Sequence, residues 1–268
     1  MIKLAIVGAA GRMGCSLIRD LASFREYSLV AAIDRPDIPV LGEDSGTHAG
    51  TRPTGVPITA DLKAAIQAAD AVIDFSFHTS VPATAELVRE FRRPFLVGTT
   101  ALDAAERAAV EAAAEVAPVL LAANMSLGIN VLSELVKRAA ELLPRGYDIE
   151  IVEMHHRHKK DAPSGTAMTL AEAAADGRKS NLADVACYGR HGITGERDAE
   201  TIAIHSLRGG DVVGDHTVIF AADGERIELC HKASSRQCFS SGALRAMLRL
   251  VALKPGLYNM NDILHGTR

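Results

Sequence analysis

The feature that most constrains the fold is a glycine pattern between an apolar run and an amphipathic segment. "IKLAIVG" at 2–8 predicts a buried strand, and "GRMGCSLIRDLAS" at 11–23 predicts a helix with one apolar face. Gly8, Gly11 and Gly14 lie where the strand would turn into the helix. Small residues there let the backbone approach a pyrophosphate, and the helix start offers unpaired N–H groups. The spacing is GxxGxxG rather than GxGxxG. The prediction of a dinucleotide site therefore depends on the strand before the glycines and the helix after them.

The first half of the chain repeats this alternation of short strands and Ala-rich helices. Further strands are predicted at 28–34, 71–76, 94–100 and 118–126. Segments with helical period separate them, which indicates a parallel sheet covered on both faces. The Gly-, Pro- and Thr-rich segment 37–57 is expected to be a loop.

The second half has a different pattern, in which strands follow one another with fewer helices between. After a helix at 129–143, strands are predicted at 147–156, 201–208, 215–223 and 225–234. The last two are joined by Asp-Gly, a strong hairpin signal. A final helix at 241–253 is expected to return to the first domain.

The predicted fold is therefore α/β, with two domains. A Rossmann-type parallel-sheet domain that binds a dinucleotide covers 1–126 and is completed by 237–268. An α+β domain with a mixed or antiparallel sheet covers 127–236 and is expected to bind the substrate.

Composition excludes several classes of protein. The chain is 48% hydrophobic and 23% charged, which is typical of a folded domain, and its net charge of -4 does not favour nucleic acid. No apolar stretch approaches the roughly 20 residues that span a bilayer. The opening apolar run is too short for a signal peptide, and the four cysteines form no CxxC pair, so we expect a cytoplasmic protein with free thiols.

The densest positive charge lies in "VEMHHRHKKDAPSGTAMTL" at 152–170, where three histidines and two lysines occupy six residues. A metal site is disfavoured because His155 and His156 would point to opposite faces of a strand, and the lysines would repel a cation. A nucleic-acid site is disfavoured because the stretch has no aromatic residue. A solvated run of charge and a site for an anionic substrate remain open.

The segment "DAPSGTA" favours the anion site. Ser164 is a natural N-cap, so the N–H groups of Gly165 and Thr166 would point outward from a helix start. Histidine titrates near neutrality, which makes His155 the first choice of general acid. Lys159 can supply a positive charge or a proton, and a carboxylate-bearing substrate would suit this cluster.

Residues after the second strand predict how a dinucleotide is recognised. Asp34 would accept hydrogen bonds from the adenosine ribose, and Arg35 could pair with a 2′-phosphate, so NADH and NADPH are both expected to bind. The ends of later strands, at 98–100 and 122–125, are candidates for the nicotinamide side.

At these residues the chain resembles the 4-hydroxy-tetrahydrodipicolinate reductase (dihydrodipicolinate reductase) family. The resemblance rests on "GAAGRMG", "DFS", "VGTT", "AANMSLGIN", "EMHHRHKKDAPSGTA" and "SSR", which span essentially the whole chain. It implies an NAD(P)H-dependent oxidoreductase that converts 4-hydroxy-tetrahydrodipicolinate to tetrahydrodipicolinate in diaminopimelate and lysine biosynthesis. It also implies a homotetramer assembled through the sheet of the substrate domain, with no metal.

The resemblance implies a role for particular residues. His155 and Lys159 would be the proton donors, and His156, Gly165 and Thr166 would bind the substrate dicarboxylate. The residues implied to bind the dinucleotide are Gly8, Ala9, Ala10, Gly11, Arg12, Met13, Asp34, Arg35, Gly98, Thr99, Thr100, Ala122, Ala123, Asn124 and Met125. Two positions depart from the family, which often has Phe at the position of Met125 and Glu at that of Asp34.

Two other functions compete with this one. A semialdehyde or homoserine dehydrogenase is one, but the semialdehyde enzyme needs a nucleophilic cysteine, and Cys187, Cys230 and Cys238 lack a local signature for that role. The other is a dinucleotide-sensing regulator, which would not need a proton donor beside an anion site.

Overall fold

The computed structural model describes residues 1–266. They form two compact units, which we call unit 1 (residues 1–127 with the chain from Arg236 onward) and unit 2 (Gly128–Ser235). The sequence predicts boundaries one residue away from these, at 126/127 and 236/237. Residues 267 and 268, which the prediction assigns to the first domain, lie outside the described residues.

Unit 1 contains the predicted parallel sheet, with seven strands where the sequence predicts five, in the order β12-β6-β5-β4-β1-β2-β3. The strand order reverses at β1, which pairs with β4 on one side and β2 on the other. A reversal of this kind opens a crevice at the carboxyl ends of the strands. The strands are β1 Ile2–Val7, β2 Tyr27–Ile33, β3 Ile58–Thr59, β4 Ala71–Asp74, β5 Phe95–Val97, β6 Pro118–Leu121 and β12 Gly256–Tyr258.

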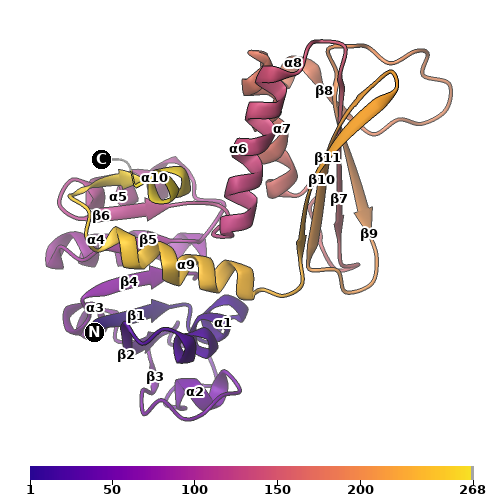
Figure 1. The fold of residues 1–268 in the computed structure, drawn as a ribbon. Helices are drawn as coiled ribbons and strands as arrows, with labels where there is room; N and C mark the ends of the chain where they lie inside the picture. The colour runs from indigo at the N-terminus through magenta and orange to yellow at the C-terminus, as the bar shows by residue number, and fades with distance from the viewer. Residues whose placement is uncertain (267–268) are drawn as a thin grey trace. The chain divides into compact units, whose positions relative to one another are not determined.

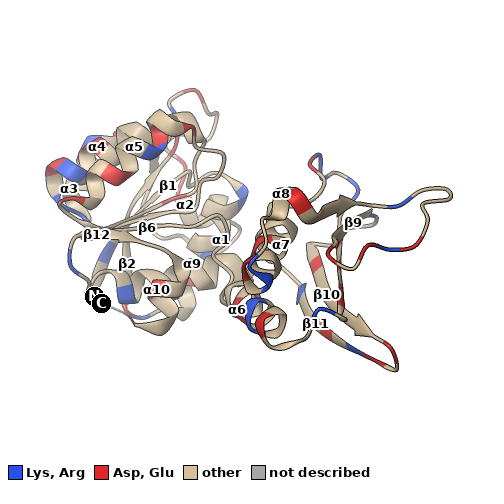
Figure 2. Ribbon diagram, turned by 90° about the horizontal axis from the view of Figure 1, so that it is seen from above, with Lys and Arg blue, Asp and Glu red and all other residues tan. Residues whose placement is uncertain are grey.

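Helices cover both faces of this sheet (Figure 1). One face packs against α1, α9 and α10, and the other against α3, α4 and α5. Acidic and basic residues are interspersed along α3, α4 and α5, as expected for helices with a solvated face (Figure 2). The helices are α1 Arg12–Asp20, η1 Leu21–Ser23, α2 Ser45–His48, α3 Leu62–Ala68, η2 His78–Ser80, α4 Val81–Phe91, α5 Ala104–Ala114, α9 Gln237–Leu250 and α10 Met260–His265.

The C-terminal segment completes unit 1 from a distance in sequence. The helix expected at 241–253 runs from Gln237 to Leu250 and packs on α1, where Ser16 and Ser240 share a hydrogen bond of 2.8 Å. The hydroxyl of Tyr27 donates to the carbonyl of Leu244 at 2.6 Å. The sequence pattern did not predict β12 or α10, because three apolar residues give no periodic signal. It was also wrong to treat 37–57 as a loop throughout, since α2 lies within it and is capped by Asp44.

Unit 2 contains a mixed sheet of five strands in the order β11-β10-β7-β9-β8, which confirms the predicted class. β10 is antiparallel to both β7 and β11, whereas β7, β9 and β8 are parallel. Gly224, with φ of +84°, forms the predicted hairpin turn. The elements are α6 Leu127–Leu142, β7 Asp148–His155, α7 Gly165–Arg178, α8 Leu182–Val185, β8 Ala186–Tyr188, β9 Ile202–Arg208, β10 Gly214–Ala222 and β11 Glu225–Ala233.

One face of this sheet packs against α6 and α7 (Figure 1). Burial alternates along β7, so Ile149 and Ile151 face the helices and enter the core. The same alternation continues to Glu153 and His155, which lie on this face and are also buried. A charged pair at the end of an apolar strand face requires specific partners, because burying polar groups without them is costly. No helix in the described part of the chain is long and apolar enough to cross a membrane.

Candidate active site

Unit 1 has a cavity of about 580 Å³ at the carboxyl ends of β1, β2 and β4. This is the position at which open parallel sheets bind ligands. Four of the sequence-predicted residues line it: Gly8, Gly11, Asp34 and Arg35. The rest of the lining is largely apolar. The other residues of the lining are Val7, Ile33, Pro36, Ala60, Leu62, Phe75, Ser76, Phe77, Thr79, Ser80, Ala83 and Thr84.

The glycine loop is shaped for close approach of backbone. Gly8 has φ of +79°, and a Cβ there would lie 2.5 Å from the carbonyl oxygen of Phe75. A Cβ at Gly14 would lie 2.2 Å from the carbonyl oxygen of Gly8. Only glycine therefore fits at either position without a shift of backbone. The loop leads directly into α1, whose N-cap is Gly11, so these residues fit a bound pyrophosphate.

Asp34 is fixed at the wall of the cavity by two backbone N–H groups. Its Oδ2 accepts from Ala10 at 2.9 Å and its Oδ1 from Arg35 at 2.9 Å. Each carboxylate oxygen has further acceptor capacity, which suits the hydroxyls of a ribose. The Arg35 side chain pairs with Asp37 at 3.2 Å, and these side chains are 72% and 69% exposed. Such an exposed pair is weak, so an incoming phosphate can compete for Arg35.

A buried carboxyl group joins the loops that follow β4 and β5. Asp74 Oδ1 accepts from the N–H of Ser76 at 2.8 Å, the hydroxyl of Ser76 at 2.6 Å and that of Thr99 at 3.0 Å. The Asp74 carbonyl accepts from the N–H of Gly98 at 2.9 Å. Burial raises the pKa of Asp74 despite these hydrogen bonds. The carboxyl therefore fixes Ser76, which lines the cavity, relative to Thr99, one of the predicted cofactor residues.

The remaining predicted cofactor residues differ in how far they are exposed to solvent. Met125 is 2% exposed and packs in the core of unit 1, so its side chain does not face a ligand. Asn124 is half-buried, and its side-chain oxygen accepts from the N–H of Ser126 at 2.8 Å. Ala9 is buried, whereas Ala10, Met13 and Ala122 are half-buried, and Arg12, Thr100 and Ala123 are exposed.

In unit 2, His155 is the last residue of β7 and is held by a buried carboxylate. Its Nδ1 lies 2.6 Å from Glu153 Oε2. Arg208 donates to both oxygens of Glu153, at 2.8 and 2.9 Å, and the N–H of Ser164 donates to Oε1 at 3.1 Å. Burial raises the pKa of Glu153, but the hydrogen bonds from Arg208 and His155 outweigh it and lower the pKa to about 2. Glu153 is therefore an anion at neutral pH.

A second imidazole lies against the first. The rings of His155 and His216 meet edge to face, and His216 Nε2 lies 3.1 Å from the Ser164 hydroxyl. Burial, with the nearby charge of His155, lowers the pKa of His216 to about 4. His216 is therefore neutral at pH 7 and packs beside His155 without competing for its proton.

The basic loop after β7 leads to a helix start. Lys159 pairs with Asp161 at 2.9 Å, and its side chain is 20% exposed. Ser164 caps α7 by accepting from the N–H of Ala167 at 3.1 Å, as the sequence predicts. Gly165 and Thr166 are the first two residues of α7, and the space where a Gly165 side chain would lie is open.

His156 lies just beyond the end of β7. Its backbone N–H donates to the carbonyl of Val212 at 2.7 Å, and its Nδ1 accepts from the N–H of His158 at 3.2 Å. His155 and His156 thus have different surroundings, one buried against Glu153 and the other half-buried in the loop.

Sequence reasoning missed several residues that contribute to these arrangements. Glu153 could have been found, because residues i and i+2 of a strand share a face and it precedes His155 by two. Arg208 and His216 gave no local signal, since they lie on β9 and β10. Phe77, which is 66% exposed and lines the cavity of unit 1, was also not predicted.

Comparison with known proteins covers nearly the whole chain. Residues 2–125 match the family model described as "Dihydrodipicolinate reductase, N-terminus", and residues 128–264 match "Dihydrodipicolinate reductase, C-terminus". Proteins named 4-hydroxy-tetrahydrodipicolinate reductase from Burkholderia lata and Halorhodospira halophila are each 49% identical over 263 residues. Those alignments cover 98% of this chain, with 99% of the first protein and 98% of the second.

Solved structures give the same result. A dihydrodipicolinate reductase with bound dipicolinate, from a Paenisporosarcina species, superposes with a TM-score of 0.77 at 26% identity, covering 97% of each chain. An aspartate semialdehyde dehydrogenase from Vibrio cholerae has a TM-score of 0.56 at 11% identity, covering 94% of this chain and 98% of its own. The second similarity reflects the fold alone. By sequence and by structure, the chain belongs to the dihydrodipicolinate reductase family.

Proposed function

We propose that this protein reduces 4-hydroxy-tetrahydrodipicolinate to tetrahydrodipicolinate with NADH or NADPH, as a step of diaminopimelate and lysine biosynthesis. The observation that carries the proposal is the buried Glu153–His155 pair at 2.6 Å, beside a lysine and the capped start of α7, in a member of this family. An ordinary solvated run of charge would not bury a carboxylate under its histidine.

Unit 1 would hold the dinucleotide. The loop at 8–13 would bind the pyrophosphate, Asp34 the ribose, and Arg35 the 2′-phosphate of NADPH. The dimensions of the glycine loop and the position of Asp34 support this assignment. The reduced nicotinamide, when bound, supplies the hydride. Since Arg35 has an alternative partner in Asp37, NADH binding would not leave its charge unpaired.

Unit 2 would bind the substrate dicarboxylate. Lys159 carries a positive charge near the loop that enters α7, and the helix start adds N–H groups and the positive end of a dipole. His156, Gly165 and Thr166 would complete the carboxylate site. Charge-assisted hydrogen bonds of this kind hold a carboxylate in one orientation, which a ring reduction requires.

His155 would donate the proton. As negative charge develops on the substrate ring, a nearby imidazolium lowers the barrier by transferring its proton to the ring. Lys159 would serve as the second proton donor and would stabilise the same charge before transfer. His216 is neutral at pH 7, so it does not compete with His155 as an acid.

We also propose a cytoplasmic homotetramer that assembles through the sheet of unit 2. The face of that sheet away from α6 and α7 carries half-buried or exposed apolar side chains, namely Val152, Met154, Leu207 and Ile219. Light scattering should give four times the mass of the chain. A Leu207→Glu variant should dissociate, and a monomeric wild-type protein would contradict the proposal.

The reaction is tested by following the absorbance of NADH and NADPH with enzymatically generated substrate. We expect oxidation of either dinucleotide only when the substrate is present. Binding of dinucleotide without oxidation would favour the regulator. Phosphate-dependent reduction of NADP⁺ with aspartate semialdehyde would favour the other dehydrogenase.

A further inference from the structure

We propose that Glu153 is a positioning residue for the proton transfer, which together with Arg208 holds His155 as the Nδ1–H tautomer and leaves Nε2 to exchange the proton. The inference rests on the proposed function, because it assigns an atom to the proposed proton donor. The inference goes beyond the proposed function because it adds Glu153 and Arg208 to the site. It also predicts the tautomer of His155 in the protein without ligands.

Glu153 contacts His155 directly. Glu153 is 0% exposed, and its Oε2 lies 2.6 Å from His155 Nδ1. An ionised carboxylate can only accept hydrogen bonds, so Nδ1 must carry the proton in the neutral ring as well as in the charged one. A carboxylate on one imidazole nitrogen thereby fixes the tautomer and the ring orientation.

Arg208 prevents the Glu153 carboxylate from taking this proton. It contacts both oxygens of Glu153, and it also donates to the carbonyl of Asp161 at 2.6 Å. The bidentate contact lowers the pKa of Glu153 to about 2, against the effect of burial. Because Glu153 remains charged, it orients the imidazole and stabilises the imidazolium, as the aspartate of a serine-protease triad does for its histidine.

A glycine lies beside the other ring nitrogen of His155, Nε2. A Cβ at position 214 would lie 3.0 Å from His155 Nε2 and 3.4 Å from its Cδ2. Gly214 therefore leaves the Nε2 side of the ring unobstructed by a side chain of its own. The ring of His216 contacts His155 edge to face and is neutral, so it adds no charge there.

The charged and titratable groups around His155 come from several elements. Glu153 precedes it on β7, Arg208 comes from β9 and His216 from β10. Lys159 and Asp161 belong to the following loop, where they pair with each other at 2.9 Å. In this set Glu153 is the carboxylate that is hydrogen-bonded to the imidazole, so its removal should act most directly on the proton of His155.

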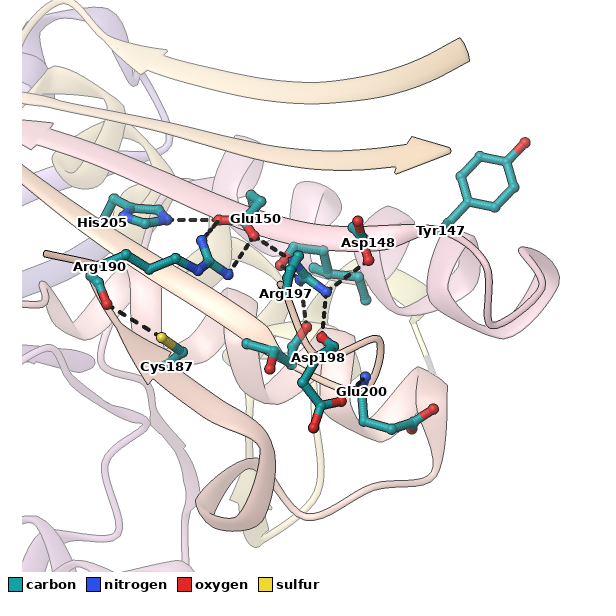
Figure 3. Close-up of polar contacts among 12 residues, drawn as sticks. Tyr147, Asp148, Glu150, Cys187, Arg190, Arg197, Asp198, Glu200 and His205 are labelled. Atoms are coloured by element: carbon teal, nitrogen blue, oxygen red, sulfur yellow. Dashed lines mark hydrogen bonds and ion pairs between the residues drawn. The ribbon is translucent and has the colours of Figure 1, made fainter. Parts of the chain in front are cut away.

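A merely structural role is the competing explanation, because buried carboxylate–arginine pairs also stabilise sheets. The same strand provides a matched control. Glu150 lies on the opposite face of β7 and accepts from Arg190, Arg197 and His205, at distances from 2.7 to 3.1 Å (Figure 3). Its pKa is also lowered to about 2, by hydrogen bonds that outweigh burial. Glu150 therefore has the same kinds of partner but no contact with His155.

The first experiment compares Glu153→Gln with Glu150→Gln across a pH series. Glu153→Gln should lower kcat about 10²-fold, with KM changed less than about threefold. Its pH profile of kcat/KM should differ from that of the wild type, because His155 loses its anionic partner. Glu150→Gln should keep the wild-type pH profile. An unmoved profile in a folded Glu153→Gln protein, or equal effects of the two variants, would overturn the proposal.

The second experiment reads the tautomer in the wild-type protein and does not require the substrate. In wild-type protein with ¹⁵N-labelled histidine, NMR at high pH should show His155 protonated at Nδ1 and unprotonated at Nε2. The resonance is assigned by its loss in His155→Gln. A dominant Nε2–H tautomer would refute the role of Glu153. If instead the tautomer is as expected and the substrate is not reduced, the proposed function fails and the arrangement of the pair stands.

Discussion

The imidazole rings of His155 and His216 lie 5.1 Å apart between centroids, with their planes at 76° to each other. The two rings differ in their partners, since His155 contacts the anionic Glu153 and His216 contacts the hydroxyl of Ser164. The two neighbouring histidines thus have different surroundings, because one contacts a carboxylate and the other a hydroxyl.

Replacing the proposed proton donor should reduce turnover without affecting the dinucleotide. We expect His155→Gln to lower kcat by about 10²- to 10⁴-fold, since the variant lacks a general acid. Calorimetric titration should give an unchanged Kd for NADH. His158→Gln, at an exposed position of the same loop, is the control. Near-normal turnover of His155→Gln would remove this residue from the role.

The pair Arg35 and Asp37 should control the choice of dinucleotide. Arg35→Ala is expected to weaken NADPH binding by about 10-fold and to spare NADH, because it removes the partner of the 2′-phosphate. Asp37→Asn should have the opposite effect on NADPH, since it frees Arg35 from a contact of 3.2 Å. The Kd values of both variants for NADH and NADPH, measured by titration, test whether Arg35 binds the 2′-phosphate. Equal losses of NADH and NADPH in Arg35→Ala would contradict the assignment.

A side chain at position 214 should hinder proton transfer. Gly214→Ala places a Cβ 3.0 Å from His155 Nε2, and Glu153 restrains the ring from moving away. We expect kcat to fall by at least about 10-fold, because small displacements of a reacting group have large effects on rate. Gly146→Ala is the matched control, since nothing lies within 4 Å of its added Cβ. Equal activity of the two variants would show that Nε2 does not need this space.

The buried carboxyl of Asp74 should make stability depend on pH. Burial raises its pKa in the folded state, so the folded protein binds this proton more tightly than the unfolded chain. Its contribution to stability is therefore present at low pH and is lost as pH rises through the folded pKa. Asp74→Asn should lack this loss, so urea unfolding should show the stability of the variant rising relative to that of the wild type as the pH increases above the ordinary pKa of a carboxyl group. The opposite trend would mean that Asp74 is an anion in the folded protein.

Phe77 offers a direct probe of the nucleotide cavity. Its carbonyl accepts from the N–H and the hydroxyl of Ser80, and its ring lies 4.3 Å from that of His78, which Glu106 holds at 2.8 Å. The chain has no tryptophan, so Phe77→Trp introduces a single tryptophan whose fluorescence can be excited selectively. AMP should quench it by stacking on the ring, whereas nicotinamide mononucleotide should not. Quenching by the second ligand alone would reverse the orientation assigned to the dinucleotide.

The sequence by itself determined the fold class and the family. Strand and helix periods are local properties, and the glycines of the 8–14 loop encode a backbone approach that other residues cannot make. The string from Glu153 to Thr166 is equally local, so its resemblance to the family could be recognised without coordinates. The predicted parallel sheet, the mixed sheet and the family are confirmed. The roles of individual site residues remain predictions.

Only the tertiary structure decided which distant residues complete these local motifs. Arg208 meets Glu153 across 55 positions of sequence because β9 pairs with β7, and β10 brings His216 to the same face. The strand β12 joins the sheet of unit 1 beside β6, although it lies near the end of the chain. The period of a strand fixes which side chains share a face, whereas the choice of neighbouring strand depends on burial and hydrogen bonding over the whole unit. No local pattern records that choice.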